Sequence, residues 1–158
     1  MKLKSFKHMN CSLAQTLEVI GERWTLLILR DAFFGIRRFD DFQRDLGIAR
    51  NILSTRLARL VEEGVLEKRS VEGSHAEYVL TDKGLDLQPV MLAMTHWGDK
   101  HKPNPKGERV IFVDRATDEP IARMSATTRD GRVLSPRDIK GVPGPGVTTL
   151  KRRSKRNG

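Results

Sequence analysis

Residues 39–80 read FDDFQRDLGIARNILSTRLARLVEEGVLEKRSVEGSHAEYVL, and this stretch decides the fold. Its apolar positions first recur at helical spacing up to Gly47, a natural left-handed cap, which predicts a short helix. Over residues 49–63 leucine and valine recur at i, i+4, i+7 and i+8, which predicts a longer helix that ends at Gly64. Residues 65–71 and 76–80 are strand-like and flank a flexible polar tip, so they predict a hairpin.

Helical patterns flank this stretch on both sides. Ser12 and Gln15 fit a capping box and predict a helix up to residue 20, whereas residues 22–34 are apolar almost all round and predict a central core helix. After the hairpin, Thr81 caps an apolar stripe that fades near His101, with a kink or break at Pro89. The order of a short helix, a tight turn, a longer helix and a basic hairpin predicts an α+β protein with a winged helix-turn-helix domain over residues 1–101.

The composition changes after residue 105. Short strand-like runs at 110–113, 121–124 and 133–134, with Asp130-Gly131 suited to a tight turn, predict a small C-terminal β appendage over residues 106–146. Residues 147–158 form a basic tail that we expect to be disordered. Two interpretations of this tail stay open: a solubilising end and a nonspecific phosphate-binding arm.

Charge and composition restrict the function. The 158 residues carry a formal net charge of +9, which favours polyanionic partners such as DNA, although five of the nine surplus charges lie in the tail. No apolar run is long enough to span a bilayer and no secretory signal precedes the first helix, so we expect a cytoplasmic protein without a membrane partner. We expect no enzyme, cofactor or metal, because the sequence has no phosphate loop, nucleophile elbow, paired carboxylates or helically spaced histidines.

The helix over 49–63 supplies the candidate base-reading side chains. Its leucine row faces inward and leaves Asn51, Ser54 and Thr55 outward near the helix start, where these polar groups suit direct contact with base edges. We expect the surrounding basic residues to contact DNA phosphates: Arg37, Arg38, Arg50, Arg59, Lys68 and Arg69. Arg56 lies at the edge of the apolar row, so we expect it to pack against the core and bind a carboxylate.

The sequence resembles the HxlR family of MarR-like winged-helix transcription regulators. Four segments carry the resemblance: CSLAQTLEVIGERW (11–24), GIRRFDDF (35–42), IARNILSTRLARLVEEGVLEKR (48–69) and YVLTDKG (78–84). The resemblance implies a homodimer, built by the first and last helices, that binds double-stranded DNA at a near-palindromic operator, most commonly as a repressor. The ending Gly144-Pro145-Gly146 resembles that of longer members, but their paired cysteines are missing, so we expect a metal-free ribbon.

Two further expectations concern assembly and regulation. Leu87, Met91, Met94 and Trp97 offer more apolar surface than one small core needs, which predicts a dimer interface. The single cysteine, Cys11, lies at the positive end of the first helix, where a thiolate is favoured. Because some relatives use a cysteine there to sense oxidants or electrophiles, the resemblance makes Cys11 a candidate redox sensor and a small molecule or oxidant a candidate effector. The alternative for Cys11 is a small packing residue.

A winged-helix domain can also serve as a protein-interaction module without specific DNA binding. That alternative keeps the same fold and uses the exposed helix for protein contacts. Basic residues flank the exposed helix at three separate places in the sequence, which favours DNA as the partner.

Overall fold

The computed structural model describes residues 5–73 and 75–147, and the chain divides into two compact units, Met1–Met124 and Ser125–Gly158. The sequence predicts a boundary between residues 101 and 106, which stays a prediction. Two residues after it contact the last long helix: Arg109 Nη1 lies 3.0 Å from Asp99 Oδ1, and the Met124 amide donates to His96 Nδ1. The predicted basic tail, apart from Val147, lies outside the described residues.

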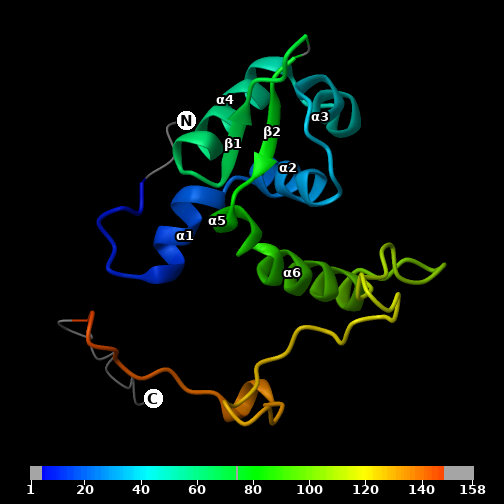
Figure 1. The fold of residues 1–158 in the computed structure, drawn as a ribbon. Coiled ribbons are helices and arrows are strands. Elements are labelled where there is room, and N and C mark those ends of the chain that lie inside the picture. Colours follow the sequence, from blue (N-terminus) through cyan, green and yellow to red (C-terminus); the bar gives the residue numbers. More distant parts are fainter. Residues whose placement is uncertain (1–4, 74, 148–158) are drawn as a thin grey trace. The chain divides into compact units, whose positions relative to one another are not determined.

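The first unit begins with the four helices that the sequence predicts (Figure 1). They are α1 (Ser12–Ile20), α2 (Arg23–Phe33), α3 (Phe39–Leu46) and α4 (Arg50–Glu62). Gly47 ends α3 with a φ of 60°, as a left-handed cap requires. The predicted capping box of α1 is wrong: Cys11 is the N-cap residue and makes no side-chain cap bond, and the Gln15 side-chain amide donates instead to the Met9 carbonyl at 2.8 Å.

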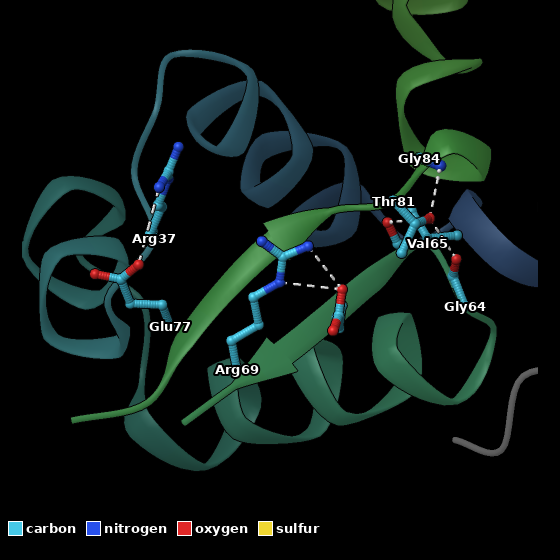
Figure 2. Close-up of polar contacts among 8 residues, drawn as sticks. Arg37, Gly64, Val65, Arg69, Glu77, Thr81 and Gly84 are labelled. Carbon is cyan, nitrogen blue, oxygen red and sulfur yellow. Dashed lines mark hydrogen bonds and ion pairs between the residues drawn. The ribbon is translucent and has the colours of Figure 1, made fainter. Parts of the chain in front are cut away.

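The predicted hairpin is confirmed, and the two helices that follow it show the predicted break. Strands β1 (Leu66–Arg69) and β2 (Glu77–Leu80) pair antiparallel (Figure 1), and α5 (Asp82–Leu85) and α6 (Gln88–His101) are separated just before Pro89. Thr81 Oγ1 accepts from the Gly84 amide at 3.1 Å and donates to the Gly64 carbonyl at 2.6 Å (Figure 2). A Cβ at Gly84 would lie 2.3 Å from the Val65 carbonyl oxygen, so this close approach requires glycine.

The hydrophobic core lies between α2, α3, α4 and the base of the hairpin. Its fully buried side chains are Ile28, Leu29, Phe42, Leu53, Leu57, Leu60, Val65 and Leu66. Leu87 and Met91 pack against this core from α6. The core therefore fixes which face of α4 points outward.

The predicted C-terminal strands do not form ladders. Among the described residues after α6, β pairing is limited to isolated bridges, Val113 with Pro120 and Thr127 with Val133. The predicted turn at Asp130-Gly131 is confirmed by a Gly131 φ of 89° and a bond from its amide to the Thr128 carbonyl. The apolar runs are short and largely exposed, so little burial supports longer pairing.

The 3₁₀ helix η1 (Pro136–Asp138) is the one helix among the described residues of the second unit. Across residues 5–73 and 75–147, no helix combines the length and the apolar character that crossing a bilayer requires.

Candidate nucleic-acid interface

The exposed face of α4 carries the three predicted base-reading residues. Asn51, Ser54 and Thr55 are all exposed in the first half of the helix. Thr55 Oγ1 donates to the Asn51 carbonyl at 2.9 Å, which commits its proton and leaves its oxygen lone pairs available as acceptors. The side chains of Asn51 and Ser54 make no hydrogen bond within the described part of the chain, so their donors and acceptors are available to a ligand.

An ion pair at the inner edge fixes the rotation of α4. Arg56 Nη2 lies 3.1 Å from Glu22 Oε2, beside the start of α2, and both side chains are about two-thirds buried. This contact confirms the expectation that Arg56 binds a carboxylate. Together with the buried leucines, it holds α4 with its polar face toward solvent.

The start of α4 presents a cation beside unoccupied backbone donors. The Arg50 guanidinium lies over the Phe39 ring at 4.6 Å and within 3.4 Å of Asp40 Oδ1, yet the side chain is 70% exposed. Ala49 is the N-cap residue and provides no side-chain acceptor for the first amides of α4. The N-terminus of a helix with free amides attracts phosphate, and Arg50 adds a full positive charge there.

The turn before α3 is joined to the hairpin through Glu77. Arg37 Nη1 lies 3.9 Å from Glu77 Oε2, and Arg38 Nε lies 3.8 Å from Glu77 Oε1. The Tyr78 amide also donates to the Arg37 carbonyl at 2.8 Å, so the backbone of the turn runs along β2. Figure 2 shows the Arg37 side chain directed toward Glu77. One carboxylate thus lies between two of the predicted phosphate-binding arginines.

The hairpin carries the other two predicted phosphate contacts on its exposed surface. Lys68 Nζ lies 5.8 Å from the centre of the Tyr78 ring. Arg69 pairs with Glu67, with its Nε and Nη2 at 3.1 and 3.0 Å from Oε2 (Figure 2). This hydrogen bond, together with the charge of Glu67, raises the pKa of Arg69.

Five of the six predicted phosphate contacts lie around α3, the start of α4 and the hairpin. The sixth, Arg59, lies in the last turn of α4. A groove of about 430 Å³ brings together Arg38, Arg50 and Lys68, and Asp40 and Asp41 of α3 also line it. Arg59 instead donates to Glu62 Oε2 at 2.7 Å and pairs with Glu63, and the hydrogen bond to Glu62 is the largest cause that raises its pKa. Two carboxylates therefore match the charge of Arg59.

Sequence reasoning missed Glu77. Glu77 is paired with Arg69 across the hairpin. A prediction of the strand register would therefore have placed these two opposite charges next to each other. The contact of Glu77 with Arg37 and Arg38 depends on how the turn before α3 meets β2, for which the sequence carries no local signal.

The four residues of the predicted dimer interface lie in two different environments, two against the core and two exposed to solvent. Leu87 and Met91 are half-buried against the core, whereas Met94 and Trp97 are 50% and 62% exposed. The exposed part continues over a hollow lined by Pro89, Val90, Ala93, Met94 and Trp97. On α1, Leu13 and Leu17 are also exposed.

Cys11 is exposed at the N-cap of α1, as a free thiol. The residue is therefore accessible in the single chain, which differs from the packing role considered above.

Comparisons with known proteins identify similar chains. A sequence model of the HxlR-like helix-turn-helix family matches residues 19–106. Rv3095 of Mycobacterium tuberculosis, an uncharacterised HTH-type transcriptional regulator, is 40% identical over 137 residues, which cover 85% of this chain and 87% of the relative. The crystal structure of PA1607, a proposed transcription factor, shares 42% identity with a TM-score of 0.82 and covers 89% of this chain and 100% of its own. The redox regulator HypR in its reduced form has 28% identity and a TM-score of 0.54, covering 58% of this chain and 94% of its own.

The position of Glu77 leads to a prediction about affinity. We expect Glu77→Gln to strengthen binding to any DNA duplex by about 1.4- to fivefold, because it removes a negative charge beside the exposed Arg37 and Arg38 and a charge interaction at the surface is worth about 0.2–1 kcal/mol. The turn should keep its place through the Tyr78 backbone bond, so the free energy of unfolding should change by less than about 0.5 kcal/mol. Fluorescence anisotropy and urea unfolding would measure the two quantities.

The matched control is Glu119→Gln, which makes the same charge change in the exposed turn that follows α6. Equal strengthening by both variants would show that only net charge matters, and a weaker Glu77→Gln complex would show that the carboxylate orients the arginines.

Proposed function

Because the chain belongs to the HxlR-like helix-turn-helix family of transcriptional regulators, we propose that it acts in the cytoplasm as a homodimeric repressor on a near-palindromic operator, without catalytic activity. One observation carries the proposal: the free polar face at the start of α4 lies next to a groove that gathers Arg38, Arg50 and Lys68. A helix that presents polar side chains between cationic flanks is the arrangement that reads base edges while phosphates fix the register. The relatives are regulators, so a pure protein-interaction module is not favoured.

In this proposal the residues divide into two roles. Asn51, Ser54 and Thr55 contact base edges in the major groove, where an asparagine can pair bidentately with adenine. Arg37, Arg38, Arg50, Lys68 and Arg69 contact phosphates on either side. Arg59 contributes less than these five, because binding a phosphate would require it to leave Glu62 and Glu63.

We further propose that α6 and α1 form the dimer interface. The exposed residues Val90, Met94 and Trp97 make a continuous apolar strip on α6, and Leu13 and Leu17 add apolar surface on α1. Leu87 and Met91 then serve mainly to hold α6 on its own core, from where they support the interface. A twofold arrangement of this kind would place two copies of α4 in successive major grooves.

Redox control through Cys11 is the regulatory part of the proposal. Two observations support it: the thiol is exposed at the N-cap of α1, and the chain resembles HypR, a redox regulator that has been solved in reduced and oxidised forms. Since the chain has one cysteine, a disulfide would need a thiol from the other protomer or from a small molecule.

The division into base and phosphate contacts predicts two kinds of loss. Asn51→Ala and Thr55→Ala should each weaken operator binding by roughly 1–3 kcal/mol and leave binding to random duplex nearly unchanged. Arg69→Ala should weaken both and reduce the slope of log affinity against log salt by about 1. Mobility shifts with the DNA upstream of the protein's own gene, over a salt series, would test this; equal losses of Asn51→Ala on both duplexes would contradict base reading.

The interface proposal predicts a dimer at micromolar concentration. Trp97→Glu should convert it to a monomer, because burying an unpaired carboxylate in an apolar interface is strongly unfavourable. Sedimentation velocity would measure the change, with Lys100→Glu as a control at an exposed position on the same helix. A wild-type monomer that still binds a full operator tightly would overturn the proposal.

The redox proposal predicts that mild oxidant changes operator affinity of the native protein and not of Cys11→Ser. A thiol probe should alkylate Cys11 in the folded native protein, because the thiol is exposed. Mobility shifts before and after oxidant would measure the operator affinity of both proteins, and a separate experiment would measure the rate of alkylation. If oxidant loosens both proteins equally, Cys11 is not the sensor.

A further inference from the structure

A cavity of about 510 Å³ lies on the side of α6 that faces α2 and residues 109–112. Its apolar wall is made of six side chains: Phe33, Phe34, Met91, Leu92, Val110 and Phe112. Cavities of about 300–1,000 Å³ with mostly apolar linings and few polar groups are typical of small-molecule sites. None of the predicted DNA-contacting residues lines this cavity.

Gly98 keeps part of the cavity open. It lies inside α6 with ordinary helical geometry, and a Cβ built there would meet no atom within 4 Å. A glycine in a helix interior lowers stability relative to alanine, and neither a positive φ nor a close neighbour in the described chain requires it here. The missing side chain instead leaves room on the cavity side of the helix.

Residues 109–112 form the third wall of the cavity, beside α6 and α2, and specific contacts hold them against α6. Arg109 Nη1 lies 3.0 Å from Asp99 Oδ1 and donates to the Lys102 carbonyl, also at 3.0 Å. The Phe112 ring packs edge-on against His96, with 6.1 Å between ring centroids. These contacts hold residues 109–112 beside α6, so the cavity is bounded on three sides without a ligand.

The charges around the cavity leave one cation unmatched. Arg30 pairs with Asp31 at 2.7 Å, and Arg109 pairs with Asp99, whose side chain is only 8% exposed. Lys102 also lines the cavity, and its ammonium group makes no ion pair with any described residue. An apolar space next to a single unmatched cation is complementary to an apolar ligand with one negative charge.

We propose that this cavity binds a small aromatic monoanion, with its rings against the phenylalanines and its anionic group at Lys102. None of the residues that line the site belongs to α4, and Cys11 does not line it either. Because α6 forms one wall, a bound ligand contacts the helix that also carries the exposed residues Met94 and Trp97.

Titration calorimetry of the full chain with 1-naphthoate tests the proposal, with 1-naphthalenemethanol as the neutral analogue. We expect 1-naphthoate to bind with one site per chain and at least about tenfold more tightly than the alcohol. Lys102→Met should weaken 1-naphthoate binding by about tenfold, whereas Lys100→Met, on the same helix but outside the cavity, should leave it unchanged.

Gly98→Leu tests the location of the site. Its side chain should fill the cavity and abolish binding while the unfolding temperature stays the same or rises, because it enters open space and improves helix propensity. Gly98→Ala improves the helix in the same way but fills little volume, so it should retain binding. Unchanged binding by Gly98→Leu would overturn the location, and equal binding of acid and alcohol would overturn the assignment of an anion.

A second copy of the chain is the rival occupant. If 1-naphthoate produces no binding heat with the wild-type protein and Gly98→Leu turns a dimer into a monomer in sedimentation, the cavity is filled by the partner protomer and the proposal is wrong.

Discussion

The burial of the leucine row of α4 is the constraint on which the rest of the structure depends. Leu53, Leu57 and Leu60 are no more than 1% exposed, and burying each such side chain contributes about 1.5–3 kcal/mol. These positions recur on one side of the helix, so their burial sets its rotation about its own axis. Asn51 and Thr55 point outward as a result, and the chemistry of the exposed face follows from the packing of the hidden one.

Local periodicity was sufficient to predict the helices and the hairpin, because the apolar spacing of each element is set by its own geometry. It failed where a competing partner or missing burial decided the outcome. The capping box at Ser12 did not form, since the Gln15 amide donates to the Met9 carbonyl and the helix begins one residue after Cys11. The C-terminal strands did not extend, because side chains such as Val133, at 64% exposure, bury too little surface.

For the candidate site, the sequence predicted which residues face outward but not all of their partners. The pairing of Arg59 with Glu62 and Glu63 follows from helical spacing of three and four residues and could have been read in advance. The sharing of Glu77 by two arginines could not, because it joins segments forty residues apart through tertiary packing. A count of basic residues in the sequence therefore overestimates the positive charge available to DNA phosphates, because some of these side chains lie beside a carboxylate.

Helix α6 takes part in three regions of the first unit. Met91 packs against the core, Trp97 belongs to the exposed apolar strip, and Gly98 lines the cavity. The link from α6 to α4 is short. Thr81 Oγ1 donates to the Gly64 carbonyl, and Lys83 Nζ donates to the Glu63 carbonyl at 2.5 Å, so α5 is tied to the end of α4. A shift of α6 therefore has a physical connection of hydrogen bonds and packed side chains to the helix whose opposite end carries the polar face.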